Sequence, residues 1–142
     1  MKILITSDVH SNLKNLNEIT KKENNISYHF DLGDFVSDTS NNNDIIYVKG
    51  NCDFGSEKPL EIIITLDNKK MLFVHGHKFN VKSGLQLLSA YCNKNNIDIC
   101  FYGHTHIASI IKINSCTFIN PGSVNKLEYA LYENNEVLLK KI

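Results

Sequence analysis

The chain has 142 residues, of which 42% are hydrophobic and 21% are charged, a composition typical of a globular domain and unlike that of a disordered chain. Fifteen basic residues balance fifteen acidic ones, and all the basic residues are lysines, so the chain has no arginine. A neutral chain without arginine lacks the basic face and guanidinium forks of proteins dedicated to DNA or RNA. We therefore expect a single domain over residues 1–142 and no dedicated nucleic-acid-binding surface.

The sequence carries no signal for export or membrane insertion. The first apolar run, residues 3–5, is far shorter than that of a signal peptide, and no run approaches the roughly 20 apolar residues that span a bilayer. Cys52, Cys92, Cys100 and Cys116 lack close paired spacing, so we expect reduced thiols and a cytoplasmic location. The oligomeric state stays open, and a homo-oligomer is compatible with the sequence.

Short apolar runs and polar loops alternate in the first part of the chain. Residues 2–6 predict a buried strand. Leu13, Leu16 and Ile19 recur at three-residue spacing and predict an amphipathic helix capped near Ser11 or Asn12. Residues 27–32 and 45–48 predict two more strands, so the pattern is typical of an α/β fold.

Strands are more frequent in the second part. Residues 60–66 and 70–75 predict a hairpin around Asp67-Asn68-Lys69, and residues 81–92 predict a helix with Leu85 and Leu88 on one face. A strand over 97–102 follows. Four further strands are predicted over 107–113, 116–119, 127–132 and 136–140.

Most of the side chains able to bind a metal lie in five short segments, each directly after a predicted strand. These segments are Asp8-Val9-His10, Gly33-Asp34, Gly50-Asn51-Cys52-Asp53, His75-Gly76-His77 and Gly103-His104-Thr105-His106. Sites in α/β sheets form outside the carboxyl ends of the strands, so we expect the segments to converge. Carboxylates and imidazoles suit divalent Mn, Zn, Fe or Ni, and two ions about 3.5–4 Å apart activate a shared water against phosphorus.

Each segment alone has an ordinary explanation. Asp8 and His10 resemble a helix cap with a surface histidine, and Gly33-Asp34 resembles a common turn. His29 has no partner ligand near it in the sequence, so we interpret it as a half-buried strand histidine outside the site. Lys49 and Lys78 are more readily explained as solvated surface. The ordered combination of five segments is what favours a metal site.

The motifs Asp-x-His, Gly-Asp, Gly-Asn-x-Asp, His-Gly-His and Gly-His-x-His, in this order from Asp8 to His106, resemble the calcineurin-like metallophosphoesterase superfamily. Cys52 in the third motif and the Asn-Pro-Gly-Ser segment at 120–123 are similar to its small bacterial and archaeal phosphodiesterases. The resemblance implies a four-layer α/β/β/α sandwich with two mixed β-sheets, the second built by the late strands. It implies one metal held by Asp8, His10 and His106, another held by Asn51, His75 and His104, and a bridge through Asp34.

The third motif departs from that of larger members of the superfamily. They have a histidine after the asparagine, thought to protonate the leaving group, where this chain has Cys52. A thiol with an ordinary pKa of about 8.5 is able to donate a proton, but cysteine is as often a small hydrophobe. Cys52 and Asp53 are therefore catalytic candidates, Asp53 through orienting His10 or a metal ligand. His77 and Asn12 are candidates for contacting phosphate.

We predict a metal-dependent phosphodiesterase in which a hydroxide bridging two divalent ions attacks phosphorus in a small phosphate ester or diester. Manganese is the first choice of metal, with Ni, Zn, Fe, Co and Mg left open. The lack of an arginine to bind a dianionic phosphate favours diesters over monoesters. The alternatives are a phosphomonoesterase and a non-catalytic protein-binding scaffold, similar to the retromer scaffold subunit of eukaryotes. Loops 35–44 and 54–59 are expected to set specificity.

Overall fold

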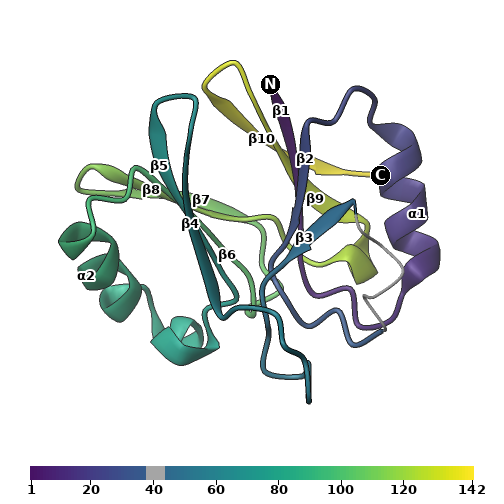
Figure 1. Cartoon of the computed structure of the whole chain (residues 1–142), viewed down its shortest axis with the longest axis horizontal. Helices are drawn as coiled ribbons and strands as arrows, with labels where there is room; N and C mark the ends of the chain where they lie inside the picture. Colours follow the sequence, from purple (N-terminus) through teal and green to yellow (C-terminus); the bar gives the residue numbers. More distant parts are fainter. Residues whose placement is uncertain (38–43) are drawn as a thin grey trace.

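The computed structural model describes residues 1–37 and 44–142, and in this part of the chain the strands form two five-stranded mixed sheets that face each other (Figure 1). Helix α1 covers the outer face of one sheet, and α2 covers that of the other. The expected four-layer α/β/β/α sandwich with two mixed β-sheets is confirmed. Most of loop 35–44, which is expected to set specificity, lies outside the described residues.

Sheet A has the strand order β10-β9-β1-β2-β3. Strands β1, β2 and β3 are parallel, whereas β9 is antiparallel to both β1 and β10. The bounds are β1 Lys2–Thr6, β2 Tyr28–Asp31, β3 Ile45–Tyr47, β9 Glu128–Glu133 and β10 Glu136–Lys141.

Sheet B has the order β4-β5-β6-β8-β7, with β5, β6 and β8 parallel and an antiparallel strand at each edge. The predicted hairpin is present, and its two turn residues, Asp67 and Asn68, have φ values of 56° and 61°, which fit the twist of a two-residue hairpin loop. The bounds are β4 Glu61–Leu66, β5 Lys69–Val74, β6 Ile99–Tyr102, β7 Ser109–Ile113 and β8 Cys116–Asn120.

The first predicted helix is α1, Leu13–Lys22, and its N-cap is Asn12, whose side chain accepts a hydrogen bond from the Asn15 N–H. The second is shorter than the predicted 81–92. Gly84, at φ 131°, separates a 3-10 turn from the helix proper. The remaining bounds are α2 Gln86–Lys94, η1 His77–Phe79, η2 Val81–Ser83 and η3 Val124–Lys126.

Three buried clusters hold the four layers together, because the strands alternate side chains between two buried faces. In β1, Ile3 and Ile5 point into the cluster between the sheets, whereas Leu4 points towards α1. Stacked aromatic rings join the sheets: the ring centroids of Phe30 and Phe73 are 3.8 Å apart. This packing places the carboxyl ends of the parallel strands of both sheets at one end of the molecule.

The late strands do not all build the second sheet, which corrects the expectation from sequence. β7 and β8 do, but β9 and β10 return to sheet A beside β1. The physical reason is burial: residues 129–132 of β9 are all buried, contributing to the inter-sheet cluster and to the cluster under α1. Among the described residues, no helix is long and apolar enough to cross a membrane.

Candidate metal centre

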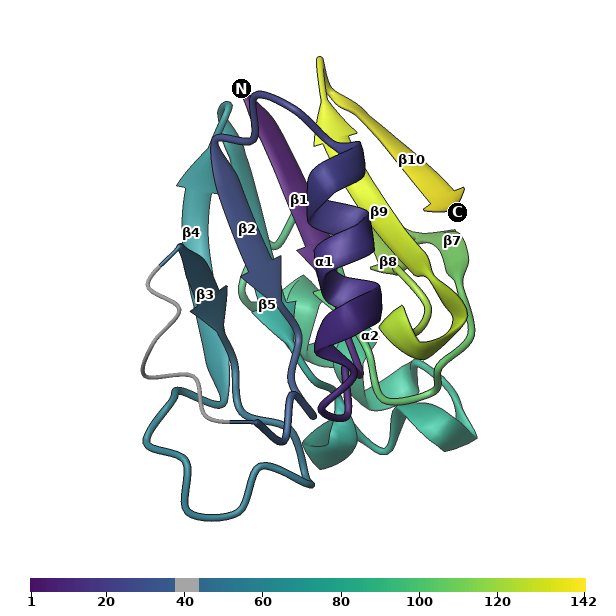
Figure 2. The same cartoon turned by 90° about the vertical axis from the view of Figure 1, so that its right-hand side faces the viewer.

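All five polar segments follow parallel strands, namely β1, β2 and β3 of sheet A and β5 and β6 of sheet B. The parallel strands of sheet A point to the same end of the molecule (Figure 2). In the described residues, three groups of His, Cys and Asp side chains bring potential ligand atoms within 4.8 Å of one another. The groups are Asp8 with His10 and His106, His10 with Asp34 and Cys52, and Asp34 with His75 and His104.

The first group is centred on the fully buried Asp8. Its Oδ2 accepts hydrogen bonds from Ser7 Oγ at 2.7 Å and from the His104 N–H at 3.1 Å. Its Oδ1 lies 3.2 Å from His106 Nε2 and 3.7 Å from His10 Nε2. Asp8 Oδ1 and His10 Nε2 are buried without a hydrogen-bond partner in the described residues. A carboxylate oxygen and an imidazole nitrogen exposed to each other in this way fit a shared divalent cation.

The second group is centred on His75, which is completely buried. Its Nδ1 lies 2.7 Å from the Leu32 carbonyl oxygen and therefore carries a hydrogen, which leaves Nε2 to face the site. Around Nε2 lie Asn51 Oδ1 at 3.0 Å, His104 Nδ1 at 3.2 Å and Asp34 Oδ2 at 3.3 Å. These atoms are all potential acceptors, so they repel one another unless a cation lies among them. That cation is either a proton or a metal ion.

Asp34 lies between the two groups. Its Oδ1 accepts a hydrogen bond of 2.7 Å from the Cys52 N–H. Its Oδ2 is 3.3 Å from His75 Nε2 and 3.8 Å from His10 Nε2. One oxygen is thus held by the backbone while the other faces both groups.

The pKa shifts describe the same electrostatics. Burial raises the pKa of Asp34, but the contacts with His75 and the Cys52 N–H outweigh it and hold the pKa far below its ordinary value. Burial lowers the pKa of His75, but the contact with Asp34 and the charge of Asp8 outweigh it and raise the pKa. Burial and the neighbouring His75 lower the pKa of His104, which favours the neutral form that binds metals.

The loops carrying these residues are tightly constrained. Five of the seven predicted ligands have a left-handed backbone, with φ values of 55° at Asp8, 47° at His10, 56° at Asp34, 71° at His104 and 63° at His106. Such conformations are uncommon outside glycine and concentrate at functional sites. At Gly50, a Cβ would collide with the backbone nitrogen and the carboxylate of Asp34. Glycine is required there because the β2 and β3 loops pass so closely.

Asp53 was expected to orient His10 or a metal ligand, and its hydrogen bonds lie in the β2 and β3 loops. Its carboxylate accepts backbone N–H groups of Asp34 and Gly50 on Oδ2, both at 2.8 Å, and of Val36 on Oδ1 at 2.9 Å. Its described contacts therefore join the β2 and β3 loops rather than orient His10. One of these contacts is with the backbone N–H of Asp34, a predicted metal ligand.

A sixth loop also contacts the centre, and the sequence indicated it only through the resemblance of the Asn-Pro-Gly-Ser segment at 120–123. It follows β8, which is parallel to β6. Asn120 Nδ2 donates to the Gly103 carbonyl oxygen and to Thr105 Oγ1, at 3.2 and 2.9 Å, and Ser123 Oγ donates to the Asp8 carbonyl oxygen at 3.0 Å. The signal in the sequence was the Asn-Pro-Gly-Ser segment directly after a strand.

The remaining candidates lie at different distances from the centre. Cys52 belongs to one of the ligand groups, and burial and the charge of Asp34 raise the pKa of its thiol. The His77 ring centroid is 5.4 Å from that of His75. Asn12 is used in capping α1, and its Nδ2 donates to Asn125. His29 is buried behind the site and lies 2.9 Å from Thr6 Oγ1.

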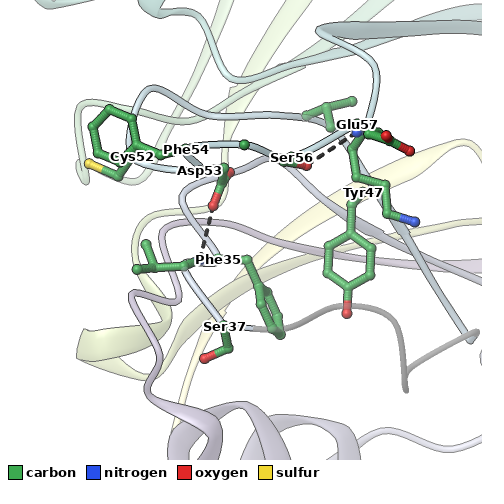
Figure 3. A pocket seen from close by; sticks show the side chains of 12 residues that line it. Phe35, Ser37, Tyr47, Cys52, Asp53, Phe54, Ser56 and Glu57 are labelled. Carbon is green, nitrogen blue, oxygen red and sulfur yellow. Dashed lines mark hydrogen bonds between the residues drawn. The ribbon is translucent and has the colours of Figure 1, made fainter.

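A pocket of about 700 Å³ opens beside the centre (Figure 3). Cys52 and Asp53 are on its wall, and Phe35 and Tyr47 pack edge to face with ring centroids 4.9 Å apart. Its size is that of a small-molecule site. Phe54, which is 91% exposed, also lines it.

Comparison with known proteins now decides the family. Residues 1–136 match the profile of the calcineurin-like phosphoesterase superfamily domain. The chain belongs to this superfamily. It is 32% identical over 127 residues to the probable metallophosphoesterase YsnB of Bacillus subtilis, covering 87% of this chain and 75% of the relative. The activity expected of a family member is metal-dependent phosphoester hydrolysis, and the Asp and His clusters described above fit it.

Two other similarities bear on function. The structure described as a novel archaeal phosphodiesterase is 26% identical, with a TM-score of 0.78 and complete coverage of both chains. Vacuolar protein sorting-associated protein 29 of Schizosaccharomyces pombe is 32% identical over 80 residues, which cover 56% of this chain and 43% of the relative.

Proposed function

We propose that this chain is a phosphodiesterase with a two-metal centre. The observation that carries the proposal is the pair of clusters joined by Asp34 Oδ2, together with the buried, unpartnered Asp8 Oδ1 and His10 Nε2. Asp8, His10 and His106 would hold one divalent ion. Asn51, His75 and His104 would hold the other, and Asp34 would contact both through Oδ2.

Two bound cations would lower the pKa of a shared water and stabilise negative charge on the phosphoryl oxygens. The protein's own contribution is preorganisation. Asp8 Oδ2 and Asp34 Oδ1 are held by N–H and O–H donors, so that the other oxygen of each carboxylate keeps its direction. His75 is fixed through the Leu32 carbonyl. The ligand atoms therefore need little reorganisation when charge develops at phosphorus.

Two facts favour diesters over monoesters. The archaeal structure that aligns with this chain over the full length of both proteins is described as a phosphodiesterase. The chain also has no arginine, the residue best suited to bind the extra charge of a monoester bidentately. Manganese remains the first metal to test, because carboxylate, amide and imidazole ligands suit it along with Ni, Zn, Fe, Co and Mg.

The second candidate function is a protein-binding scaffold, which the similarity to the fission-yeast sorting protein favours. A scaffold of this fold does not require converging ligand atoms or a bridging carboxylate. The proposal therefore stands on the site rather than on the fold.

The test is hydrolysis of bis-p-nitrophenyl phosphate and p-nitrophenyl phosphate by metal-stripped protein resupplied with one divalent metal at a time. We expect metal-restored diester cleavage, a loss of at least about 10³-fold in Asp34→Asn and His75→Ala, and wild-type rates in Lys112→Gln, a substitution on the exposed edge strand β7.

Cys52→Ser is expected to keep the diester rate within about threefold, because p-nitrophenolate leaves without protonation, whereas loss of a required acid costs about 10²–10⁴. Folded wild-type protein that is inactive with every metal would favour the scaffold.

A further inference from the structure

A second pocket, of about 560 Å³, shares loop residues 53–58 with the pocket in Figure 3 but extends to the turn at His77 and Lys78. Asn51 also lines it, so it adjoins the proposed metal centre on the His75 side. Its volume is that of a site able to accept a group as large as a nucleotide.

Three lysines line this second pocket: Lys49, Lys58 and Lys78. Elsewhere lysines neutralise carboxylates, as Lys2 and Lys140 do for Glu23. Within residues 1–37 and 44–142, no ion pair engages the three pocket lysines. The Lys58 ammonium lies 5.7 Å from the Tyr47 ring centroid, and the Lys49 backbone N–H is fixed by the Pro59 carbonyl at 2.7 Å.

Two carboxylates line the same pocket, Asp53 and Glu57. Both Asp53 oxygens already accept backbone N–H groups, so they compete weakly for the ammonium groups. Glu57 is exposed. Three lysines thus face two carboxylates in this pocket, and the excess of positive charge attracts an anion.

His77 also lines the second pocket, and its ring centroid lies 5.4 Å from that of His75. Its Nδ1 is buried without a hydrogen-bond partner in the described residues, so it offers a hydrogen-bonding group to a ligand beside the lysines.

We propose that this pocket is a subsite for a second phosphate group of the substrate. The preferred substrates are small phosphodiesters that carry a further phosphate, with the diester at the metal centre and the second phosphate contacted by Lys49 and Lys78. Lysine binds phosphate as a point charge without bidentate geometry, which suits a chain lacking arginine. The inference rests on the proposed function for the identity of the reacting group.

The test compares two chromogenic substrates, the p-nitrophenyl ester of thymidine 5′-phosphate and the same ester with an additional 3′-phosphate. We expect the manganese-loaded protein to favour the 3′-phosphorylated ester by about tenfold in kcat/KM. The double variant Lys49→Gln/Lys78→Gln is expected to reduce this preference below about twofold, and Glu57→Gln to increase it about two- to threefold. Lys112→Gln makes the same type of substitution outside the pocket, on β7, and should leave the preference unchanged.

A binding measurement separates this inference from the proposed function. Calorimetry with thymidine 3′,5′-bisphosphate and thymidine 5′-phosphate should give about tenfold tighter binding of the bisphosphate, lost in the double variant. If the protein bound the bisphosphate more tightly but hydrolysed neither ester, the subsite would be supported and the proposed phosphodiesterase activity would be contradicted. Equal affinity for the two nucleotides, or a preference that survives in the double variant, would overturn the subsite.

Discussion

The two halves of the candidate centre differ in how far the protein fixes them. In the Asp8 half, formed by Asp8, His10 and His106, the two histidine side chains are 29% and 41% exposed. In the His75 half, formed by Asn51, His75 and His104 with Asp34 shared between the two halves, His75 is completely buried and anchored by the Leu32 carbonyl. An anchored ligand loses little freedom on binding a metal, so we infer that the His75 half is the tighter site and the Asp8 half the more exchangeable one.

The largest expected effect tests this difference directly. His75→Ala should weaken the higher-affinity manganese site by about 100-fold, because it removes a buried ligand that Leu32 holds in place. His106→Ala should weaken the lower-affinity site by about tenfold and leave the other site nearly unchanged, because its side chain is partly exposed and water can take its place. Calorimetric titration of metal-free protein with manganese measures both sites, with Lys112→Gln as the control.

Equal losses for the two histidine variants would contradict the comparison. A larger loss for His106→Ala would reverse it and make the exposed half the anchor of the centre.

The second prediction concerns the supports behind each half. Asp53→Ala removes the acceptor of three backbone N–H groups beside Asp34 and should lower the free energy of unfolding by about 3 kcal/mol. Ser123→Ala removes one buried hydrogen bond to the Asp8 carbonyl and should cost about 1 kcal/mol. Urea unfolding of metal-free protein measures both. Glu57→Ala, an exposed change in the same loop as Asp53, is the matched control. If the Ser123 variant were as unstable as the Asp53 variant, the supports behind the two halves would not differ in strength.

These supports also mark the limit of what the sequence predicts. The ligand segments were recognisable because each follows an apolar run and because their chemistry is restricted to Asp, Asn and His. The hydrogen bond that the Asp34 amide donates to Asp53 depends on how closely the β2 and β3 loops pass, which no local pattern encodes. The role of Ser123 likewise depends on β8 lying parallel to β6.

Strand pairing was the other limit. The periodicity of residues 127–132 predicted a strand, but β9 pairs with β1, about 125 residues away in the chain, rather than with β8. Only the burial of both faces of β9 selects a central position in sheet A, and an apolar run alone fits an edge or a centre equally well. The helix at 81–92 was placed too early because Gly84 permits a backbone that interrupts it.

The smallest expected effect lies behind the His75 half, in the buried residues of β2 that precede Asp34. Burial raises the pKa of Asp31 to about 8 and lowers that of His29 to about 4. Thr6 Oγ1 donates to Asp31 and therefore accepts from His29 Nε2–H, so the histidine is neutral with its hydrogen on Nε2.

The two groups act on stability in opposite directions. A raised carboxyl pKa stabilises the folded protein at low pH, and this contribution is lost as pH rises from about 4 towards 8; a lowered histidine pKa costs stability as pH falls from about 6.5 to 4. Only Asp31 contributes between pH 6.5 and 8. There the free energy of unfolding of metal-free wild type should decrease by about 1 kcal/mol relative to Asp31→Asn.

Denaturant unfolding of both proteins at intervals across that range measures the difference. The comparison with Asp31→Asn cancels the pH dependence that the two proteins share. Parallel stability curves would mean that the Asp31 carboxylate is already ionised in the folded protein, stabilised by the Thr6 hydroxyl and the Gly33 N–H. The layer beneath Asp34 would then add a fixed negative charge to the His75 half, and the tighter metal binding inferred for that half would have an electrostatic cause in addition to its anchored histidine.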